Sequence, residues 1–201
     1  MSLFSPKFKR REQGITNYKK RFSMLKSKLP RVVVRVTNKR VLTHATEFME
    51  KGDKTTVFVD SAHLKTFGWK HSIKSIPAAY LTGVLLASTM KERGLNHDCI
   101  IDLGIKTNTK GSRIFAVLKG AADAGLKFPH STDYFPSDDR VSGKHIDTYR
   151  KTDVSKDFAD LKAKIMSGAA KVVKSEKKKA KSTKTKAVKE NKEDTKTRKH
   201  S

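Results

Sequence analysis

The fold of this 201-residue chain is decided by the stretch Arg31-Val32-Val33-Val34-Arg35-Val36-Thr37. β-Branched side chains dominate it, and their restricted χ1 angles favour an extended strand over a helix. Because successive side chains of a strand point to opposite faces, Val32 and Val34 share one face and Arg31 and Arg35 share the other. The stretch therefore predicts a strand with one apolar face and one cationic face.

The residues after this strand predict two more strands in an antiparallel meander. Asn38-Lys39 supplies a turn, and residues 41–46 return as a partner strand. A break at Gly52-Asp53 precedes a third strand, which we place at residues 55–60.

Three helices and a fourth strand complete the predicted core. Residues 75–93, 113–126 and 154–166 carry apolar side chains at helical spacing. Residues 99–103 are an apolar run without alternation, which favours a central strand covered on both faces. Residues 127–147 are rich in Pro, Ser and Asp and indicate an ordered irregular loop. The fold class is α/β, with a mixed sheet and helices packed on it.

The composition divides the chain into four segments. Residues 1–30 are an extended basic arm, with a short helical turn near residues 17–26, and residues 31–150 form the α/β core. Residues 151–167 form a C-terminal helix. Residues 168–201 are a Lys-rich, low-complexity tail without aromatic, Leu or Ile residues, so we expect this tail to be disordered when alone.

The formal net charge of the chain is +25, and only part of it comes from the tail. Residues 151–201 contain 17 Lys or Arg and 7 Asp or Glu, and the rest of the chain contains 28 basic and 13 acidic residues. Such a chain needs a polyanionic partner to offset its self-repulsion, and RNA or DNA is the first candidate. The single cysteine, Cys99, excludes a disulfide framework and fits a cytoplasmic setting, and no apolar run is long enough for a membrane span.

Three cationic elements are candidates for nucleic-acid contact. The first forty residues hold 13 Lys or Arg and a single acid, with aromatic residues among them, as in Tyr18-Lys19-Lys20-Arg21-Phe22. Such an arm can neutralise phosphates and stack on bases. Arg31 and Arg35, with the cations of the following turn, predict a rigid platform for bidentate phosphate contacts. The polar loop at residues 106–113 runs into a helix N-terminus, which attracts phosphate.

Other interpretations of the cationic elements remain open from the residues alone. Arg31 and Arg35 also fit an ordinary solvated sheet face. Lys70 lies beside Trp69 in a loop that either contacts RNA or protein or only packs its indole. The Lys-rich tail suits any polyanion, so a non-specific nucleic-acid compaction protein is an alternative function.

An enzyme is the less favoured alternative. Asp60, Asp102 and Asp123 suggest a metal nuclease with carboxylates at strand ends, although a single Asp in such a place is more often a turn residue or a helix cap. Asp102-Leu103-Gly104 is a weak match to a phosphate loop of sugar-kinase-like ATPases, for which the chain is too short. The seven histidines show no metal-ligand spacing, so we expect neither a metal site nor a cofactor.

Several blocks of the sequence resemble one protein family in the same order. They are residues 10–18, 31–40, 78–83 and the long ungapped block 113–126, continuing through Pro129-His130-Ser131 and Phe135-Pro136. In these blocks the chain resembles the archaeal and eukaryotic form of large-subunit ribosomal protein eighteen, a 5S ribosomal RNA-binding family, over about residues 7–150. The tail beyond about Ser167 departs from the family pattern, and the lack of long insertions favours an archaeal source.

The resemblance implies a core related to the ribonuclease-H-like motif without catalysis, in a structural protein of the central protuberance of the large ribosomal subunit. It implies 5S rRNA, large-subunit rRNA and neighbouring ribosomal proteins as partners, and neither a membrane nor a small-molecule substrate. It also adds Asn38 and the loop residues His130, Ser131, Lys144 and His145 to the site. The candidate RNA-binding residues are Lys7, Lys9, Arg10, Arg11, Tyr18, Lys19, Lys20, Arg21, Arg31, Arg35, Asn38, Lys39, Arg40, Lys70, Lys106, Thr107, Lys110, Arg113, His130, Lys144 and His145.

Overall fold

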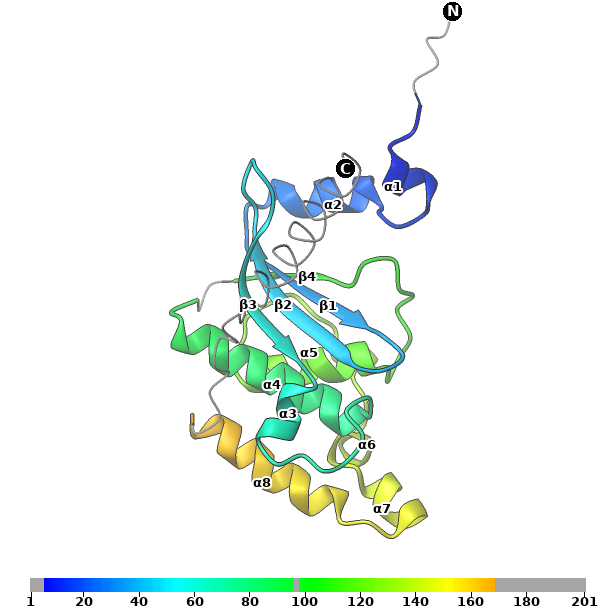
Figure 1. Cartoon of the computed structure of the whole chain (residues 1–201), viewed down its shortest axis with the longest axis vertical. Coiled ribbons are helices and arrows are strands. Elements are labelled where there is room, and N and C mark those ends of the chain that lie inside the picture. The colour runs from blue at the N-terminus through cyan, green and yellow to red at the C-terminus, as the bar shows by residue number, and fades with distance from the viewer. Residues whose placement is uncertain (1–5, 96–97, 169–201) are drawn as a thin grey trace, which may run out of the picture.

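A four-stranded mixed sheet organises the chain, which a computed structural model describes over residues 6–95 and 98–168 (Figure 1). The strands are β1 (Arg31–Val36), β2 (Val41–Glu47), β3 (Lys54–Asp60) and β4 (Ile100–Asp102), in the order β3-β2-β1-β4. β1, β2 and β3 pair antiparallel, and β4 lies parallel to β1. The predicted α/β class and the meander are confirmed. The expected disorder of the tail falls on residues 169–201, outside the described ranges.

The predicted alternation of β1 is correct for its apolar face. Val32 and Val34 are fully buried, and they face the helical layer. Val34 is paired with Thr43 of β2, which is also buried. The Thr43 hydroxyl donates a hydrogen bond to the Val59 carbonyl oxygen. One face of the sheet therefore belongs to the hydrophobic core.

The three predicted helices exist as α4 (Ile76–Glu92), α5 (Arg113–Asp123) and α8 (Val154–Met166). α4 and α5 cover the core face of the sheet, and α8 packs on α4 from the side away from the sheet (Figure 1). The bounds of α8 are those predicted, while α5 ends three residues early. It ends because Gly125 follows it with a φ of 90°, a left-handed conformation that stops a helix.

α4 and α5 approach closely because each has a glycine at the contact. A Cβ on Gly83 would overlap the Val117 carbonyl oxygen, and a Cβ on Gly120 would overlap the Tyr80 carbonyl oxygen. The Tyr80 hydroxyl also donates a hydrogen bond to Asp123, 2.7 Å away. The two helices thus form a tight layer beneath the sheet.

Strand β4 differs from its prediction, because it lies at the edge of the sheet. It has only three residues, and Ile100 and Ile101 are half-buried rather than covered on both faces. Neighbouring chain segments accept hydrogen bonds from the backbone at its start: the Cys99 N–H donates to the Lys127 carbonyl, and the Ile100 N–H donates to the Pro30 carbonyl. The apolar run was therefore a poor guide to its position, since loops as well as strands bury such residues.

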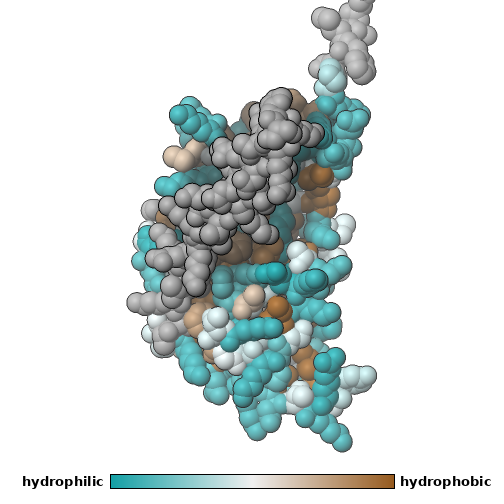
Figure 2. Space-filling model, viewed as in Figure 1, coloured by the Kyte–Doolittle hydropathy of each residue, from teal (hydrophilic) through white to brown (hydrophobic). Residues whose placement is uncertain are grey.

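Residues 127–147 contain more regular structure than the irregular loop predicted. They include the 3₁₀ turn η1 (Thr132–Tyr134), α6 (Asp138–Ser142) and most of α7 (Lys144–Arg150), and a further short helix, α3 (His63–Thr66), follows β3. These helices span fewer than two turns, too few for an apolar stripe to repeat, and this is why the sequence pattern missed them. Over α7 and α8 the surface is mostly hydrophilic, with small apolar patches (Figure 2).

Over residues 6–30, the N-terminal arm is partly helical rather than extended. It contains α1 (Lys9–Glu12) and α2 (Tyr18–Lys26), and the helical turn expected near residues 17–26 is confirmed as α2. No helix among the described residues is long and apolar enough to cross a membrane.

Candidate nucleic-acid interface

Helix α2 is a polar helix at the end of the sheet where β1 begins (Figure 1), and none of its nine residues is fully buried. The Asn17 side chain caps it by accepting a hydrogen bond from the Lys20 N–H at 3.1 Å. At its other end the Lys26 ammonium lies 5.0 Å from the centre of the Phe22 ring. Tyr18, Met24 and Leu25 are half-buried on one side of the helix, so partial hydrophobic burial and polar contacts hold it together.

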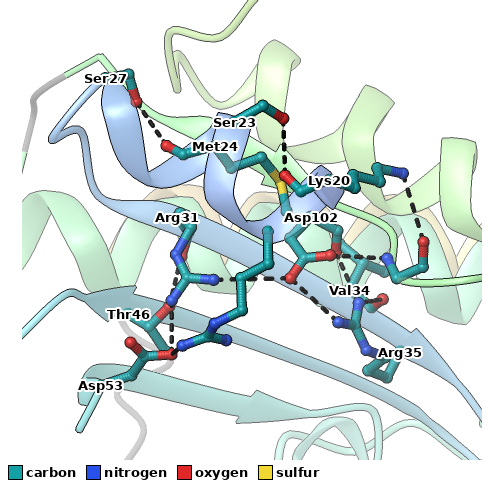
Figure 3. A network of polar contacts seen from close by, with 12 residues as sticks. Lys20, Ser23, Met24, Ser27, Arg31, Val34, Arg35, Thr46, Asp53 and Asp102 are labelled. Carbon is teal, nitrogen blue, oxygen red and sulfur yellow. Dashed lines mark hydrogen bonds and ion pairs between the residues drawn. The ribbon is translucent and has the colours of Figure 1, made fainter. Parts of the chain in front are cut away.

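Those contacts centre on Asp53, in the turn between β2 and β3 (Figure 3). Arg21 of α2 and Arg31 of β1 both donate to the same oxygen, Asp53 Oδ2, at 2.7 and 2.6 Å. The Arg31 Nη1 atom also lies 3.9 Å from Asp102 Oδ2 of β4. We call Arg21, Arg31, Asp53 and Asp102 the Asp53 latch. It connects α2, β1 and β4 with the β2–β3 hairpin.

Arg31 corrects the expectation of an open cationic platform. Its side chain is 2% exposed, so it does not present its guanidinium to solvent. A buried guanidinium requires anionic partners, and here Asp53 and Asp102 supply them. The alternation of β1 correctly placed Arg31 on the face away from the core, but α2 and the hairpin cover that end of the face.

Arg35 remains partly open on the same sheet face. Its guanidinium donates to the Asp102 carbonyl oxygen at 2.7 Å and to the Asp102 carboxylate at 3.2 Å, while the side chain stays 39% exposed. Gly104 lies directly against it: a Cβ there would be 2.9 Å from Arg35 Cζ, and the φ of Gly104 is 70°. Arg35 is therefore a fixed cation with one side free, which is the geometry expected of a platform residue.

α1, α2 and the loop after β4 surround a hollow of about 230 Å³ that opens beside Arg35. Arg10 is oriented by a hydrogen bond to the Thr16 hydroxyl at 2.9 Å, and the Lys20 ammonium donates to the Gly104 carbonyl at 3.4 Å. A second hollow of about 370 Å³, lined by Arg11, Tyr18, Lys19 and Ile105, adjoins this region. We call Arg10, Arg11, Lys19, Lys20 and Arg35 the arm surface.

Aromatic side chains accompany the arm surface. Phe8 and Tyr18 lie with their ring centres 5.3 Å apart, and Phe8 is 71% exposed. Lys7 and Lys9 are exposed beside them. The structure therefore brings together the predicted residues Lys7, Lys9, Arg10, Arg11, Tyr18, Lys19, Lys20, Arg21 and Arg35. Cations for phosphates and rings for bases occur here on one folded surface.

Electrostatics keep the Asp53 latch ionised. Burial works to raise the pKa of Asp53, but the hydrogen bonds and charges of Arg21 and Arg31 outweigh it, and the pKa lies below its ordinary value of 3.8. Asp53 is therefore an anion at any pH at which the protein works, and the two guanidinium groups it holds keep their positions.

The loop after β4 extends this surface. Lys106, Thr107 and Lys110 are exposed, and the Lys110 ammonium lies 5.9 Å from the Tyr134 ring centre. Arg113 is half-buried at the start of α5, and it donates to the Lys74 carbonyl oxygen at 3.5 Å. The lysines of this loop are accessible to phosphate, whereas Arg113 also ties the loop to the segment before α4.

The turn between β1 and β2 lies apart from the latch. Asn38, Lys39 and Arg40 are exposed there, at the opposite end of β1 from Arg31. Arg40 pairs with Asp60 at 2.7 Å. The predicted platform combined Arg31 with the cations of this turn. In the structure they lie at opposite ends of β1.

The remaining predicted residues lie elsewhere. Lys70 and His145 line one pocket, and Lys144 is exposed and pairs with Asp139 at 3.0 Å. Trp69, next to Lys70, is 3% exposed, so its indole packs into the core, and contact of Lys70 with RNA stays a prediction.

His130 has a structural environment as well as an exposed surface. Its ring lies 4.9 Å from the ring of Phe128 and 5.1 Å from that of Phe135, and its Nδ1 is 2.9 Å from the Phe128 carbonyl oxygen. These contacts fix the loop in which it lies.

Sequence reasoning missed two features of the site. Asp53 was interpreted only as part of a turn, because nothing local indicates that distant arginines converge on it. Tyr149 and Arg150 line the pocket of Lys70 and His145. The adjacent aromatic and cation are the same kind of signal that marked Tyr18-Lys19, and they would have identified this pair.

The three aspartates of the nuclease interpretation have separate partners. Asp60 pairs with Arg40 and accepts from the Ala62 N–H, and Asp123 accepts from Tyr80. Asp102 is held in the latch. Within residues 6–95 and 98–168, no group of three His, Cys, Asp or Glu side chains is arranged to hold a metal ion.

Comparison with known proteins places this sequence in a family. The family model described as "Ribosomal large subunit proteins 60S L5, and 50S L18" matches residues 2–97 and 88–131. A large ribosomal subunit protein uL18 of Korarchaeum cryptofilum is 43% identical over 146 residues, covering 73% of this chain and 74% of the relative. That of Methanothrix thermoacetophila is 42% identical over 159 residues, covering 79% and 94%. That of Methanosphaera stadtmanae is 41% identical over 151 residues, covering 75% and 78%.

The match includes the arm surface, the latch and helix α5, and the relatives are archaeal, as the resemblance implied. The chain therefore belongs to the uL18 family of large ribosomal subunit proteins, which are structural components of the ribosome rather than enzymes.

Proposed function

We propose that this chain binds 5S rRNA through its arm surface and helps to attach that RNA to the large-subunit rRNA in the central protuberance. Family membership supports this role, since the family it resembles binds 5S rRNA. The observation that carries the proposal is the Asp53 latch, because it fixes a helix with a cationic outer side on a rigid sheet. Cations held in place lose less freedom on binding than cations of a flexible arm.

The arm surface suits RNA better than a uniform polyanion. Its guanidinium groups can form bidentate contacts with phosphates, and Phe8 and Tyr18 offer ring faces to unpaired bases. Arg35 adds a cation whose position is set by two contacts to Asp102. We propose shape readout of a folded RNA, with phosphates bound across the arm surface.

Neighbouring ribosomal proteins are the further partners that we propose. Phe48 and Met49, at the end of β2 and in the hairpin that follows, are 58% and 52% exposed, which supports a protein contact at this hairpin.

We also propose that the core is related to the ribonuclease-H-like motif. An antiparallel meander followed by a parallel fourth strand, in the order β3-β2-β1-β4, supports this relation. Asp60, Asp102 and Asp123 each have their own hydrogen-bonding partner, which argues against a role as shared metal ligands. Cleavage of RNA with Mg²⁺, abolished by Asp102→Asn, would support the nuclease alternative.

A filter-binding titration tests the RNA proposal on the full chain. The ligands are 5S rRNA, a structured RNA of similar length and duplex DNA, at about 0.15 M salt. We expect 5S rRNA to bind most tightly. Duplex DNA binding as tightly as 5S rRNA would support the compaction alternative and overturn this proposal.

A pair of double variants with equal charge loss locates the surface. Arg10→Ala with Arg11→Ala removes two cations of the arm surface, whereas Lys51→Ala with Lys54→Ala removes two exposed cations near the hairpin. We expect the arm variant to lose about ten-fold or more of its 5S affinity and the hairpin variant to lose much less. Equal losses would show that only net charge matters.

A further inference from the structure

A second cationic pocket lies far from the arm surface, at the end of the molecule formed by α7 and the start of α8. It has a volume of about 610 Å³, within the range of about 300–1,000 Å³ typical of ligand sites. Its lining residues come from the segment before α4 and from α7 with the residues that follow it. Figure 1 shows α7 and the start of α8 at the end of the molecule opposite α2. We call it the distal pocket.

The rim of the distal pocket is basic. Lys70, His71 and Lys74 stand on one wall, and His145 and Arg150 stand on the other. None of the described residues that line it is acidic. The nearby Asp157 is engaged by His71 at 3.0 Å. The rim therefore favours an anionic ligand.

Apolar and aromatic side chains accompany these cations. Ile146, Tyr149 and Val154 line the pocket, and Tyr149 is 86% exposed. In the part of the chain that the structure describes, no other ring stacks on Tyr149. A free phenol face beside lysines is suited to a ligand that is planar at one end and anionic at the other.

The walls of the distal pocket are fixed before any ligand arrives. Trp69 Nε1 donates to the Ser72 carbonyl oxygen at 3.3 Å, and the Ser75 hydroxyl donates to the same oxygen at 2.8 Å. The contact of His71 with Asp157 then ties this segment to α8. Such preorganisation lowers the entropic cost of binding.

The opposite wall is fixed by Gly143 and Asp147. Gly143 has a φ of 89°, and a Cβ there would lie 2.9 Å from Val154 Cγ1, so only glycine lets α7 approach α8 this closely. Asp147 accepts from the Val154 N–H at 2.7 Å and from the Ser155 N–H at 3.0 Å. Its charge is therefore used inside the fold and not in the pocket.

We propose that the distal pocket binds a single unpaired RNA nucleotide, with its base against Tyr149 and its phosphate at Lys70 and Lys74. This rests on the proposed function, since it supposes an RNA partner, but it concerns a different surface. An acidic peptide would satisfy the lysines and leave the phenol face of Tyr149 unused, whereas a nucleotide uses both.

The single tryptophan of the chain provides a local reporter. Trp69 is adjacent to Lys70, and its ring lies 5.2 Å from that of His71, which lines the pocket. We expect a uridine hexanucleotide, titrated into the full chain, to change the Trp69 fluorescence in a saturable way. Ligand on the arm surface would leave this signal unchanged.

Variants at Tyr149 test the base contact. Because Tyr149 is 86% exposed, Tyr149→Ala should leave the fold intact, which circular dichroism checks. We expect Tyr149→Ala to weaken the hexanucleotide about five-fold or more, since base–aromatic stacking is commonly of that strength. Tyr149→Phe keeps the ring and should keep the affinity. Equal affinity for the wild type and Tyr149→Ala would overturn the proposal.

Two further probes and one variant distinguish a nucleotide from simpler anions and from peptides. If tripolyphosphate binds as tightly as the hexanucleotide, the pocket is only an anion site and the proposal is wrong. If a glutamate hexapeptide binds more tightly, the partner is a protein and the proposal is also wrong. Arg10→Ala with Arg11→Ala should preserve the Trp69 response. For the wild type, a missing preference for 5S rRNA together with a saturable Trp69 response would contradict only the proposed function. Normal 5S binding without any Trp69 response would contradict only the distal-pocket proposal.

Discussion

The buried guanidinium of Arg31 donates to Asp53 Oδ2 over 2.6 Å, and this one contact joins the first strand to the turn before the third. The same carboxylate oxygen accepts from Arg21 of α2. One carboxylate thus holds a buried arginine of β1 on one side and a surface helix on the other. The Nε of Arg31 has no hydrogen-bond partner among the described residues, so Asp53 and Asp102 supply its main compensation for burial.

Removing the charge of Asp53 should release α2. In Asp53→Asn we expect faster amide hydrogen exchange over residues 18–26, because Arg21 loses its anionic partner. The free energy of unfolding should fall by about 1–3 kcal/mol, since Arg31 keeps only the more distant Asp102. Hydrogen exchange with mass spectrometry and urea unfolding measure the two effects.

Glu50→Gln is the matched control for this change. It removes one negative charge from the same hairpin at an exposed position, and we expect neither effect. If both variants loosened α2 equally, the general charge balance and not the latch would hold the helix.

The latch should also weaken in acid. The pKa of Asp53 is lower in the folded protein than its ordinary value of 3.8, so its contribution to stability is complete well above that value. The contribution is lost as the pH falls through the lowered folded-state pKa. We expect the NMR signals of α2 to stay constant from neutral pH to about pH 5 and to move with the Asp53 carboxyl signal at lower pH. Movement of α2 near pH 6–7, where histidines titrate, would contradict this.

The sequence predicted the parts of this molecule whose causes are local. The valines of β1 and the apolar stripe of α8 repeat with the period of their own element, and both were placed correctly. The burial of Arg31 could not be predicted from its local sequence, because its anionic partners come from the hairpin and from β4. The same alternation therefore gave a correct core face and an incorrect open platform.

The sequence likewise does not show that the two glycines of the α4–α5 contact lie close together. Gly83 and Gly120 are far apart in the sequence, and each looks like a weak point of a helix. Only their juxtaposition shows that each makes room for a carbonyl group of the other helix. The distal pocket has the same origin, since its two walls come from the segment before α4 and from α7.

Alanine at either helix glycine should destabilise the fold. In an exposed helix, Gly→Ala is stabilising, but here the new Cβ of Gly83→Ala would overlap the Val117 carbonyl oxygen. We expect a loss of about 1–3 kcal/mol in urea unfolding for Gly83→Ala and for Gly120→Ala. Ser88→Ala, at a half-buried position of α4, should change stability by much less. A stabilising effect at Gly83 would show that α4 and α5 leave room for a methyl group at their contact.

Cys99 should be chemically inert in the folded protein. It is 1% exposed, and burial, with the nearby Asp98 charge, raises the pKa of its thiol to about 11. At pH 8 the folded chain then contains about a hundred-fold less thiolate than a thiol with the ordinary value, so iodoacetamide should react far more slowly than in urea. Mass spectrometry of the alkylated chain measures both rates. Similar rates in the two conditions would indicate that the β4 edge opens readily.

Arg35 should contribute more to RNA binding than any single lysine of the tail. Its guanidinium is held by Asp102 and keeps an open side, whereas a tail lysine such as Lys178 stands among other lysines that can replace it. We expect Arg35→Ala to weaken 5S binding about ten-fold, Lys178→Ala to weaken it less than about two-fold, and Arg35→Lys to fall between them.

Repeating the filter-binding titration at several salt concentrations separates the effect of charge from the effect of geometry. Arg35→Lys keeps the charge, so its salt dependence should match that of the wild type while its affinity is lower. Equal losses for Arg35→Ala and Lys178→Ala would mean that the RNA responds to charge alone.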